Sequence, residues 1–174
     1  SFIYRVLAIY GCYLAGFVSS FCTQLLMRLL LQTAVESAHL EVKEGFTEAL
    51  FAKLAPPFPP VKVLRFDGCR AGDLVDLELN FIFFKQKWTS KITEDHLDAQ
   101  EFRFVDEGIV LPFFLGKWRH CHRILARPSG SIISDEIDFE GVFFWLTPLL
   151  YPLLWLQFWY RKPIYRRIFR NIWK

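Results

Sequence analysis

The sequence lacks the features that mark several common classes of protein. Its four cysteines, Cys12, Cys22, Cys69 and Cys121, form no Cys-x-x-Cys pair, which argues against a zinc ribbon or a dense disulfide framework. The net charge is only +3, and its basic excess lies in residues 161–174, so a nucleic-acid-binding surface is not expected. Widely spaced thiols are typical of small core residues in a reducing compartment, which favours a cytoplasmic protein.

Apolar residues, in contrast, are abundant. Hydrophobic residues make up 53% of the 174 positions and aromatic residues 18%, with 19 Phe and 6 Trp. This length fits one domain with a substantial core, and the apolar content excludes a disordered chain. The composition favours either an internal cavity lined by apolar side chains or a contact with a membrane.

The N-terminal segment, residues 1–27, has no charged residue from Val6 to Met27. At about 1.5 Å per residue, a helix of this length could cross a hydrocarbon core of roughly 30 Å. Arg5 ahead of the apolar run also resembles the start of a signal sequence, although no small-x-small cleavage site follows. A membrane anchor, a signal-like segment and a packed helix therefore stay open for this segment, and an anchor would make the protein membrane-associated. We assign residues 28–174 to the folded domain.

The middle of the chain has the alternation of half-buried antiparallel strands. In residues 73–81, for example, Val75 and Leu77 face one side while Asp76 and Glu78 face the other. Two short helices are expected after the first strand, over 39–45 with Ser37 as N-cap and over 46–54. An apolar loop is expected over 108–116. Strands are expected over residues 28–35, 61–66, 73–81, 84–93, 101–106, 117–126 and 131–139.

The C-terminal region predicts one long helix. From Thr147 to Trp173 apolar residues recur at helical spacing, with Thr147 as the expected N-cap and Pro148 at the first helical position. The uncharged run over 141–160 is interpreted as part of this helix rather than as a membrane span. No helix separates the later strands, which excludes a parallel βαβ architecture and gives the α+β class.

This order of elements and several sequence strings resemble the SRPBCC superfamily, the START and polyketide-cyclase-like helix-grip proteins, and in particular its small bacterial ligand-binding members. The resemblance spans residues 29–169 and implies a curved antiparallel sheet wrapped around a long C-terminal helix, with a cavity for a hydrophobic small molecule or lipid. The strings are LFAKLAPPFPPVKVLRFDG, GDLVDLEL, QKWTSKITE, FVDEGIVLPFF, KWRHCHRI, SDEIDFE and FWYRKPIYRRIF.

Strand alternation places a polar patch on the inward face of this sheet. His120 and His122 point the same way, and with Asp135 on the next strand they could form a charge-assisted network, which makes these three the weak candidates for catalysis. A third strong ligand beside them is not evident, so neither a metal nor a cofactor is expected. The residues expected to contact a ligand are Gln86, Trp88, Ser90, Phe113, Phe114, Trp118, His120 and His122.

Three functions stay open. The favoured one is binding, or transport, of a hydrophobic small molecule or lipid without catalysis. The second is a cyclase, dehydratase or hydrolase that uses the cavity histidines, with Asp106 or Glu107 as a carboxylate. The third is a membrane-attached protein that handles lipid, with membrane contact through residues 6–27 or through the basic C-terminal tail.

Overall fold

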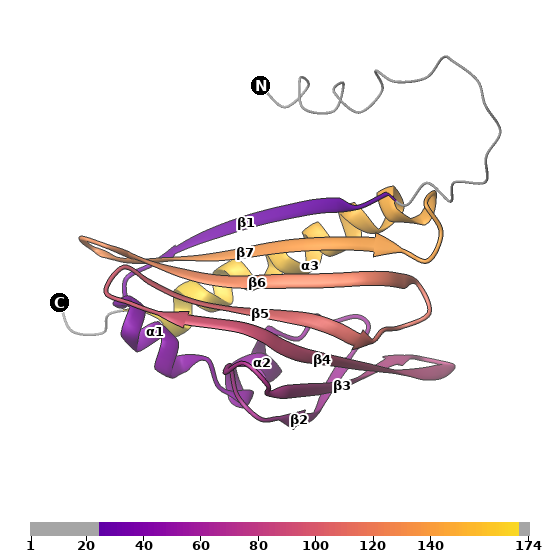
Figure 1. Cartoon of the computed structure of the whole chain (residues 1–174), viewed down its shortest axis with the longest axis horizontal. Coiled ribbons are helices and arrows are strands. Elements are labelled where there is room, and N and C mark those ends of the chain that lie inside the picture. Colours follow the sequence, from indigo (N-terminus) through magenta and orange to yellow (C-terminus); the bar gives the residue numbers. More distant parts are fainter. Residues whose placement is uncertain (1–24, 171–174) are drawn as a thin grey trace, which may run out of the picture.

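A computed structural model describes residues 25–170 as one curved sheet with a long helix against it (Figure 1). The sheet has seven strands in the order β1-β7-β6-β5-β4-β3-β2, and every neighbouring pair is antiparallel. The predicted α+β helix-grip architecture is confirmed. The elements are β1 (Met27–Val35), α1 (His39–Gly45), α2 (Glu48–Leu54), β2 (Val61–Phe66), β3 (Leu74–Phe81), β4 (Phe84–Leu97), β5 (Glu101–Val110), β6 (Leu115–Arg127), β7 (Gly130–Gly141) and α3 (Leu146–Ile168).

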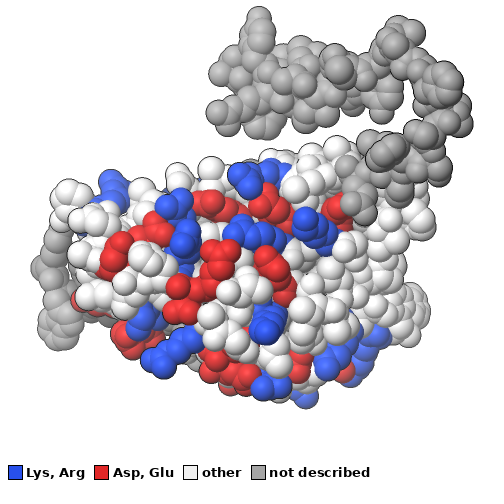
Figure 2. Space-filling model, viewed as in Figure 1, with Lys and Arg blue, Asp and Glu red and all other residues white. Residues whose placement is uncertain are grey.

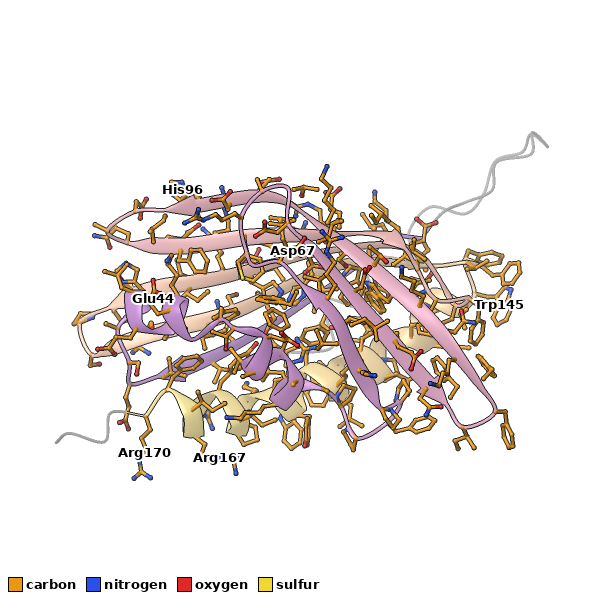
Figure 3. The ribbon with its side chains drawn as sticks, turned by 90° about the horizontal axis from the view of Figure 1, so that it is seen from below. Glu44, Asp67, His96, Trp145, Arg167 and Arg170 are labelled. Carbon is orange, nitrogen blue, oxygen red and sulfur yellow. The ribbon has the colours of Figure 1, made fainter. Side chains whose placement is uncertain are left out.

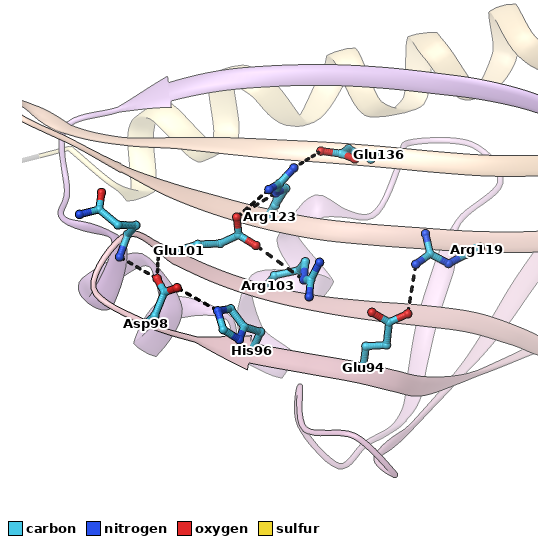
Figure 4. Close-up of polar contacts among 9 residues, drawn as sticks. Glu94, His96, Asp98, Glu101, Arg103, Arg119, Arg123 and Glu136 are labelled. Atoms are coloured by element: carbon cyan, nitrogen blue, oxygen red, sulfur yellow. Dashed lines mark hydrogen bonds and ion pairs between the residues drawn. The ribbon is translucent and has the colours of Figure 1, made fainter.

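The outer face of the sheet is charged. Arg123 bridges Glu101 on β5, at 2.7 Å, and Glu136 on β7, at 3.5 Å, while Arg119 contacts Glu94 on β4 at 3.2 Å (Figure 4). Acidic and basic side chains are interspersed over this face (Figure 2). Because side chains alternate along a strand, the apolar residues are directed to the opposite, concave face, where α3 lies.

Several strands are longer than the sequence pattern predicted, most clearly β4, β5 and β6. β4 runs to Leu97 rather than to residue 93, and β5 runs to Val110 rather than to residue 106. β6 begins at Leu115, so the loop predicted over 108–116 shrinks to residues 111–114. A register shift between Ile92 and Glu94 interrupts the alternation while the ladder with β5 continues. A pattern of period two therefore ends at such a bulge even though the strand does not.

The two short helices differ from the prediction at their N-termini: α1 has another N-cap residue, and α2 starts later. Ala38 occupies the N-cap position of α1, and the Glu41 carboxylate accepts a hydrogen bond from its backbone N–H. The backbone N–H of Ser37, the predicted cap, instead donates to the carbonyl of Phe169. α2 begins at Glu48 because the Thr47 hydroxyl caps it by accepting from the N–H of Leu50 at 3.4 Å.

The start of α3 also differs from the prediction. Trp145 is the N-cap residue, so Pro148 is not at the first helical position. The hydroxyl of Thr147, the predicted cap, accepts a hydrogen bond from the N–H of Gly141 at 3.0 Å and so ties α3 to the end of β7. α3 ends at Ile168, and residues 171–173 of the predicted helix lie outside the described residues. Within residues 25–170, no helix has the length and apolar character needed to cross a membrane.

The core forms two clusters along α3. α3 packs on β1 and β7 at one edge of the sheet, whereas α1 and α2 cover the end of the sheet near the C-terminal half of α3. The first cluster joins α1 and α2 to this half of α3 through residues such as Val42, Leu50 and Tyr165. The second joins the N-terminal half of α3 to β1, β6 and β7 through residues such as Leu29, Phe139 and Leu154. Packing on one edge leaves space between α3 and the strands farther along the sheet.

Candidate functional site

This space is a cavity of about 670 Å³. One wall comes from strands β2 to β6, the other from α3, and the α2–β2 connection with its prolines closes one side. The wall is apolar except near its centre. The apolar lining includes Val61, Val63, Phe66, Val75, Leu77, Leu79, Phe81, Trp88, Phe104, Phe114, Trp118, Leu150, Leu154 and Phe158.

A buried polar cluster lies on the sheet wall of this cavity. Strand register explains its composition, because Asp106 on β5 is directly opposite His120 on β6, and His122 is directly opposite Asp135 on β7. His120, His122 and Asp135 are each no more than 3% exposed. Ser90 on β4 extends the cluster toward the far strands.

The two histidines and two aspartates alternate around a ring of contacts. Nε2 of His120 lies 3.0 Å from Oδ1 of Asp135, and its Nδ1 lies 3.4 Å from Oδ2 of Asp106. Nε2 of His122 lies 3.3 Å from the same Asp106 oxygen, and its Nδ1 lies 3.5 Å from Asp135. Each imidazole is therefore placed between two carboxylates, and the two rings lie 3.7 Å apart between centroids.

Two tryptophans complete the hydrogen bonds of the cluster on the side of β4. The Trp118 indole N–H donates to Oδ1 of Asp106 at 3.1 Å, and the Trp88 indole N–H donates to the Ser90 hydroxyl oxygen at 3.0 Å. The two indole rings meet edge to face at 4.8 Å. A buried indole needs such a partner, so the polar cluster and the aromatic wall of the cavity stabilise each other.

The carboxylates are held in their charged form. Burial by itself raises the pKa of Asp106, but the hydrogen bond with His122 and the nearby charges of the histidines outweigh it, so this pKa lies below its ordinary value. For Asp135 burial is likewise outweighed by the hydrogen bond with His120, by the histidine charges and by Arg161, and its pKa is lowered. Both groups are therefore ionised at neutral pH.

His122 is held in its neutral form. Phe104 stacks on its ring at 4.3 Å, and the rings of Phe46 and Phe51 approach at steep angles. Burial in this aromatic surrounding, together with repulsion from His120, lowers the pKa of His122 to about 4. A neutral imidazole has one donor and one acceptor nitrogen, so His122 can accept a hydrogen bond at neutral pH.

α3 supplies a cation opposite the cluster. The Arg161 guanidinium lies 4.0 Å above the Phe158 ring, and this ring meets His120 edge to face at 5.0 Å. Tyr165, one turn farther along α3, is fully buried, and burial together with the charge of Asp135 raises its pKa. The guanidinium thus partly balances the charge of Asp135.

Three of these residues have the composition of a metal site. One ligand atom from each of Asp106, His120 and His122 lies within 4.8 Å of the others. Asp106 therefore provides the third ligand that was not evident in the sequence. The Asp106 carboxylate already contacts ring nitrogens of both histidines, and a bound metal ion would have to replace these contacts and any proton they share. We retain the prediction that no metal is bound here.

The structure gathers most of the predicted ligand-contacting residues at the cavity and leaves two outside it. Trp88, Ser90, Phe114, Trp118, His120 and His122 line the cavity. Gln86 lies outside the cavity lining, and its side-chain oxygen accepts from the backbone N–H of Phe113, which is 60% exposed. Asp135 lies behind the histidines and reaches the cavity only through them.

Sequence reasoning named Asp106 only as an alternative to Glu107 for a catalytic carboxylate, and it gave no site role to Arg161, Phe158 or Tyr165. Asp106 could have been found, because it shares the inward parity of Phe102 and Phe104 on the same strand. The α3 residues had no comparable signal. Their approach to the cluster depends on how α3 crosses the sheet.

Comparisons with known proteins agree with this fold. The sequence matches no protein-family model and no curated protein. Among solved structures, protein CV1439 from Chromobacterium violaceum has a TM-score of 0.57 at 19% identity, covering 80% of this chain and 97% of that chain. Norcoclaurine synthase from Thalictrum flavum has a TM-score of 0.55 at 12% identity, with coverage of 82% and 87%. Major latex-like protein 151 from Panax ginseng has a TM-score of 0.54 at 14% identity, covering 76% of this chain and 92% of that chain.

The curved sheet, the long C-terminal helix and the cavity between them define a helix-grip protein. The chain has the fold of the SRPBCC superfamily, as its sequence resemblance implied. At identities this low, the fold is what the chain shares with these proteins.

Proposed function

We propose that this protein binds a hydrophobic small molecule or lipid in its cavity and carries it without transforming it. The observation that supports this proposal is the cavity of about 670 Å³, whose wall is apolar except for one polar cluster. Cavities of roughly 300–1,000 Å³ with a few placed polar groups are typical of small-molecule sites. The expected ligand has an apolar body and one polar end that forms hydrogen bonds with Ser90, Asp106 or His120.

A pair of tryptophan substitutions tests the cavity as the binding site. Leu77 on β3 lines the cavity, whereas Leu64 on the neighbouring β2 is 50% exposed and lies outside the lining. Leu77→Trp should reduce the amount of copurifying ligand, measured by native mass spectrometry and solvent extraction, at least about tenfold because it fills the space. Leu64→Trp should leave ligand loading unchanged. Equal loading of both variants, or an empty wild-type protein, would overturn the proposal.

The second candidate function is acid–base catalysis in the same cavity. It is favoured by one observation, the neutral His122 that lies 3.3 Å from an ionised Asp106, because an unprotonated imidazole beside a carboxylate is an arrangement that general bases use. Norcoclaurine synthase, whose structure was solved with dopamine and hydroxybenzaldehyde, is an enzyme with a similar fold.

The two candidates differ in what the protein should contain after purification. An enzyme that holds product in the wild type should hold unconverted substrate, of different mass, in His120→Ala and His122→Ala. A carrier should hold molecules of the same mass in all three proteins. Mass spectrometry of the extracted ligand therefore decides between them.

A further inference from the structure

One end of the domain is covered by exposed apolar side chains. Figure 1 places the β3–β4 turn, the β5–β6 connection and the β7–α3 connection at this end, where β1 also begins. The same end has few charged side chains in Figure 2, in contrast to the middle of the sheet. We name it the apolar tip, and its residues are Ile82, Phe83, Phe84, Ile109, Val110, Phe113, Val142, Phe143, Phe144 and Trp145, which are between 45% and 92% exposed.

The turns at the opposite end of the sheet are polar. The β4–β5 connection is Asp98-Ala99-Gln100, and the β6–β7 turn contains Pro128 and Ser129. Figure 3 shows Trp145 at one end of the molecule and Arg167 and Arg170 at the other. Apolar turns are therefore a property of one end and not of the sheet as a whole.

The β3–β4 turn is built against ordinary turn preferences. A two-residue hairpin turn favours Asn or Gly where φ is positive, yet this one contains Ile82 and Phe83, and Ile82 has φ +50°. A β-branched residue in this region is strained, and strained backbone positions cluster at functional sites. Phe83 is 92% exposed, so it stabilises nothing within the domain.

An unbroken series of aromatic rings joins the apolar tip to the cavity. Phe81 and Phe114 line the cavity, and their rings lie 6.1 Å apart. Phe81 stacks on Phe84 of the tip at 5.3 Å, and Phe114 meets Phe113 of the tip at 5.3 Å. A hydrophobic ligand could therefore leave the cavity along apolar surface toward this end.

The described part of the chain also begins at this end. Met27 at the start of β1 is paired with Phe139, two residues before the end of β7 and the tip residues that follow. The sequence from Val6 to Leu26 contains no charged residue. The described part of the chain therefore begins beside the apolar tip, and the sequence that precedes it is uncharged; a bilayer can accommodate both features.

We propose that the apolar tip docks on a lipid bilayer, with the tip side chains entering the interfacial region and the cavity opening toward it. The opening of the cavity toward the bilayer depends on the proposed function, whereas the docking of the apolar tip on the bilayer does not. A contact of this kind requires exposed aromatic and aliphatic residues that cover several loops of one end, as here. It leaves the basic end of α3 facing away from the membrane.

Flotation of the full chain with phosphatidylcholine vesicles tests this proposal. Phe83→Asp and Phe144→Asp should each lower the ratio of vesicle-bound to free protein about tenfold, because each places a charge in the interface in place of an apolar side chain. Leu97→Asp is the matched control, since Leu97 is 49% exposed at the opposite end of the sheet. It should bind vesicles like the wild type. All three side chains are exposed, so thermal unfolding should show that each variant is folded.

Hydrogen exchange on the same samples gives an independent readout. Vesicles should protect the backbone amides of residues 82–84 and 142–145 and leave residues 98–100 unchanged. The proposal is overturned if the wild type does not float, if the tip variants float like Leu97→Asp, or if the tip variants only abolish self-association in vesicle-free solution. Ligand loading measured without vesicles should be the same in Phe83→Asp as in the wild type. An empty cavity in both proteins would refute the proposed function, whereas the flotation result alone decides whether the tip docks on a bilayer.

Discussion

His120 binds Asp135 across a diagonal of the sheet. The register places His122 opposite Asp135 and places His120 opposite Ile137. The contact from Asp135 to His120 is nevertheless the shorter one, 3.0 Å against 3.5 Å to His122. Diagonal neighbours on an antiparallel pair remain within reach of long side chains. One carboxylate on β7 therefore holds both histidines of β6 in place behind the cavity wall.

Removal of this carboxylate charge should destabilise the domain. We expect Asp135→Asn to lower the free energy of unfolding by about 2–4 kcal/mol, because it leaves a buried imidazole pair with one charged partner fewer. Urea-induced unfolding at pH 7 measures this change. Asp138→Asn is the control, since it breaks an ion pair with Arg28, whose side chain is 72% exposed, and should cost less than about 1 kcal/mol. Equal losses in the two variants would contradict the assigned role of Asp135.

Stability should fall as the pH decreases from 6.5 to 4. His122 takes up a proton near pH 6.5 in the unfolded chain but only near pH 4 in the folded protein, because its folded pKa is lowered to about 4. The unfolded state therefore binds more protons in this range, which costs up to about 3 kcal/mol. The lowered pKa values of Asp106 and Asp135 add to this loss only from about pH 5 downward, and most of their contribution is lost below about pH 4.

Unfolding of a histidine variant checks the origin of this pH dependence. His122→Asn should be less stable than the wild type at pH 7 but should lose less stability between pH 6.5 and 4. His39→Gln, on the partly exposed first residue of α1, should keep the wild-type slope. If the stability of His122→Asn falls with decreasing pH as steeply as that of the wild type, another group causes the pH dependence.

Alanine substitutions at two glycines distinguish the stability cost of a positive φ angle from the cost of a steric collision. Gly130 and Gly72 have nearly equal positive φ angles, +103° and +102°, but a Cβ atom at Gly130 would collide with the carbonyl oxygen of Val35, whereas at Gly72 it would meet nothing within 4 Å. Gly72→Ala should cost about 1 kcal/mol from the φ angle, and Gly130→Ala about 3 kcal/mol or more. Thermal unfolding of both variants measures the difference. Similar costs would mean that the β6–β7 turn relaxes around the added methyl group.

The polar cluster should hold no metal ion. Protein purified without chelator should contain no stoichiometric zinc, iron or manganese by mass spectrometry of the elements, and EDTA should leave its Tm unchanged. The reason is that the Asp106 carboxylate already faces a ring nitrogen of His120 at 3.4 Å and of His122 at 3.3 Å, and a metal ion would have to replace these contacts. One equivalent of metal that is lost in His122→Asn would overturn this prediction.

The strand alternation made much of the fold and part of the site predictable. It placed Trp118, His120 and His122 on one face, and Ile133, Asp135 and Ile137 on a common face, as the structure shows. It failed at β-bulges, where the β4 register shifts and the pattern of period two ends before the strand does. The prediction of N-cap residues was wrong where the side chain has another partner in the tertiary structure, as Thr147 has in Gly141.

The sequence by itself determined which residues face inward, because the two faces of a strand follow from chain geometry alone. It also determined the order of elements, from which the helix-grip class could be inferred. Only the tertiary structure decided that Asp106 joins the two histidines and that Arg161 faces them, because these contacts depend on strand register and on the crossing of α3. It also decided that apolar turns far apart in sequence gather at one end of the domain. Sequence spacing carries no information on such distances until the sheet is assembled.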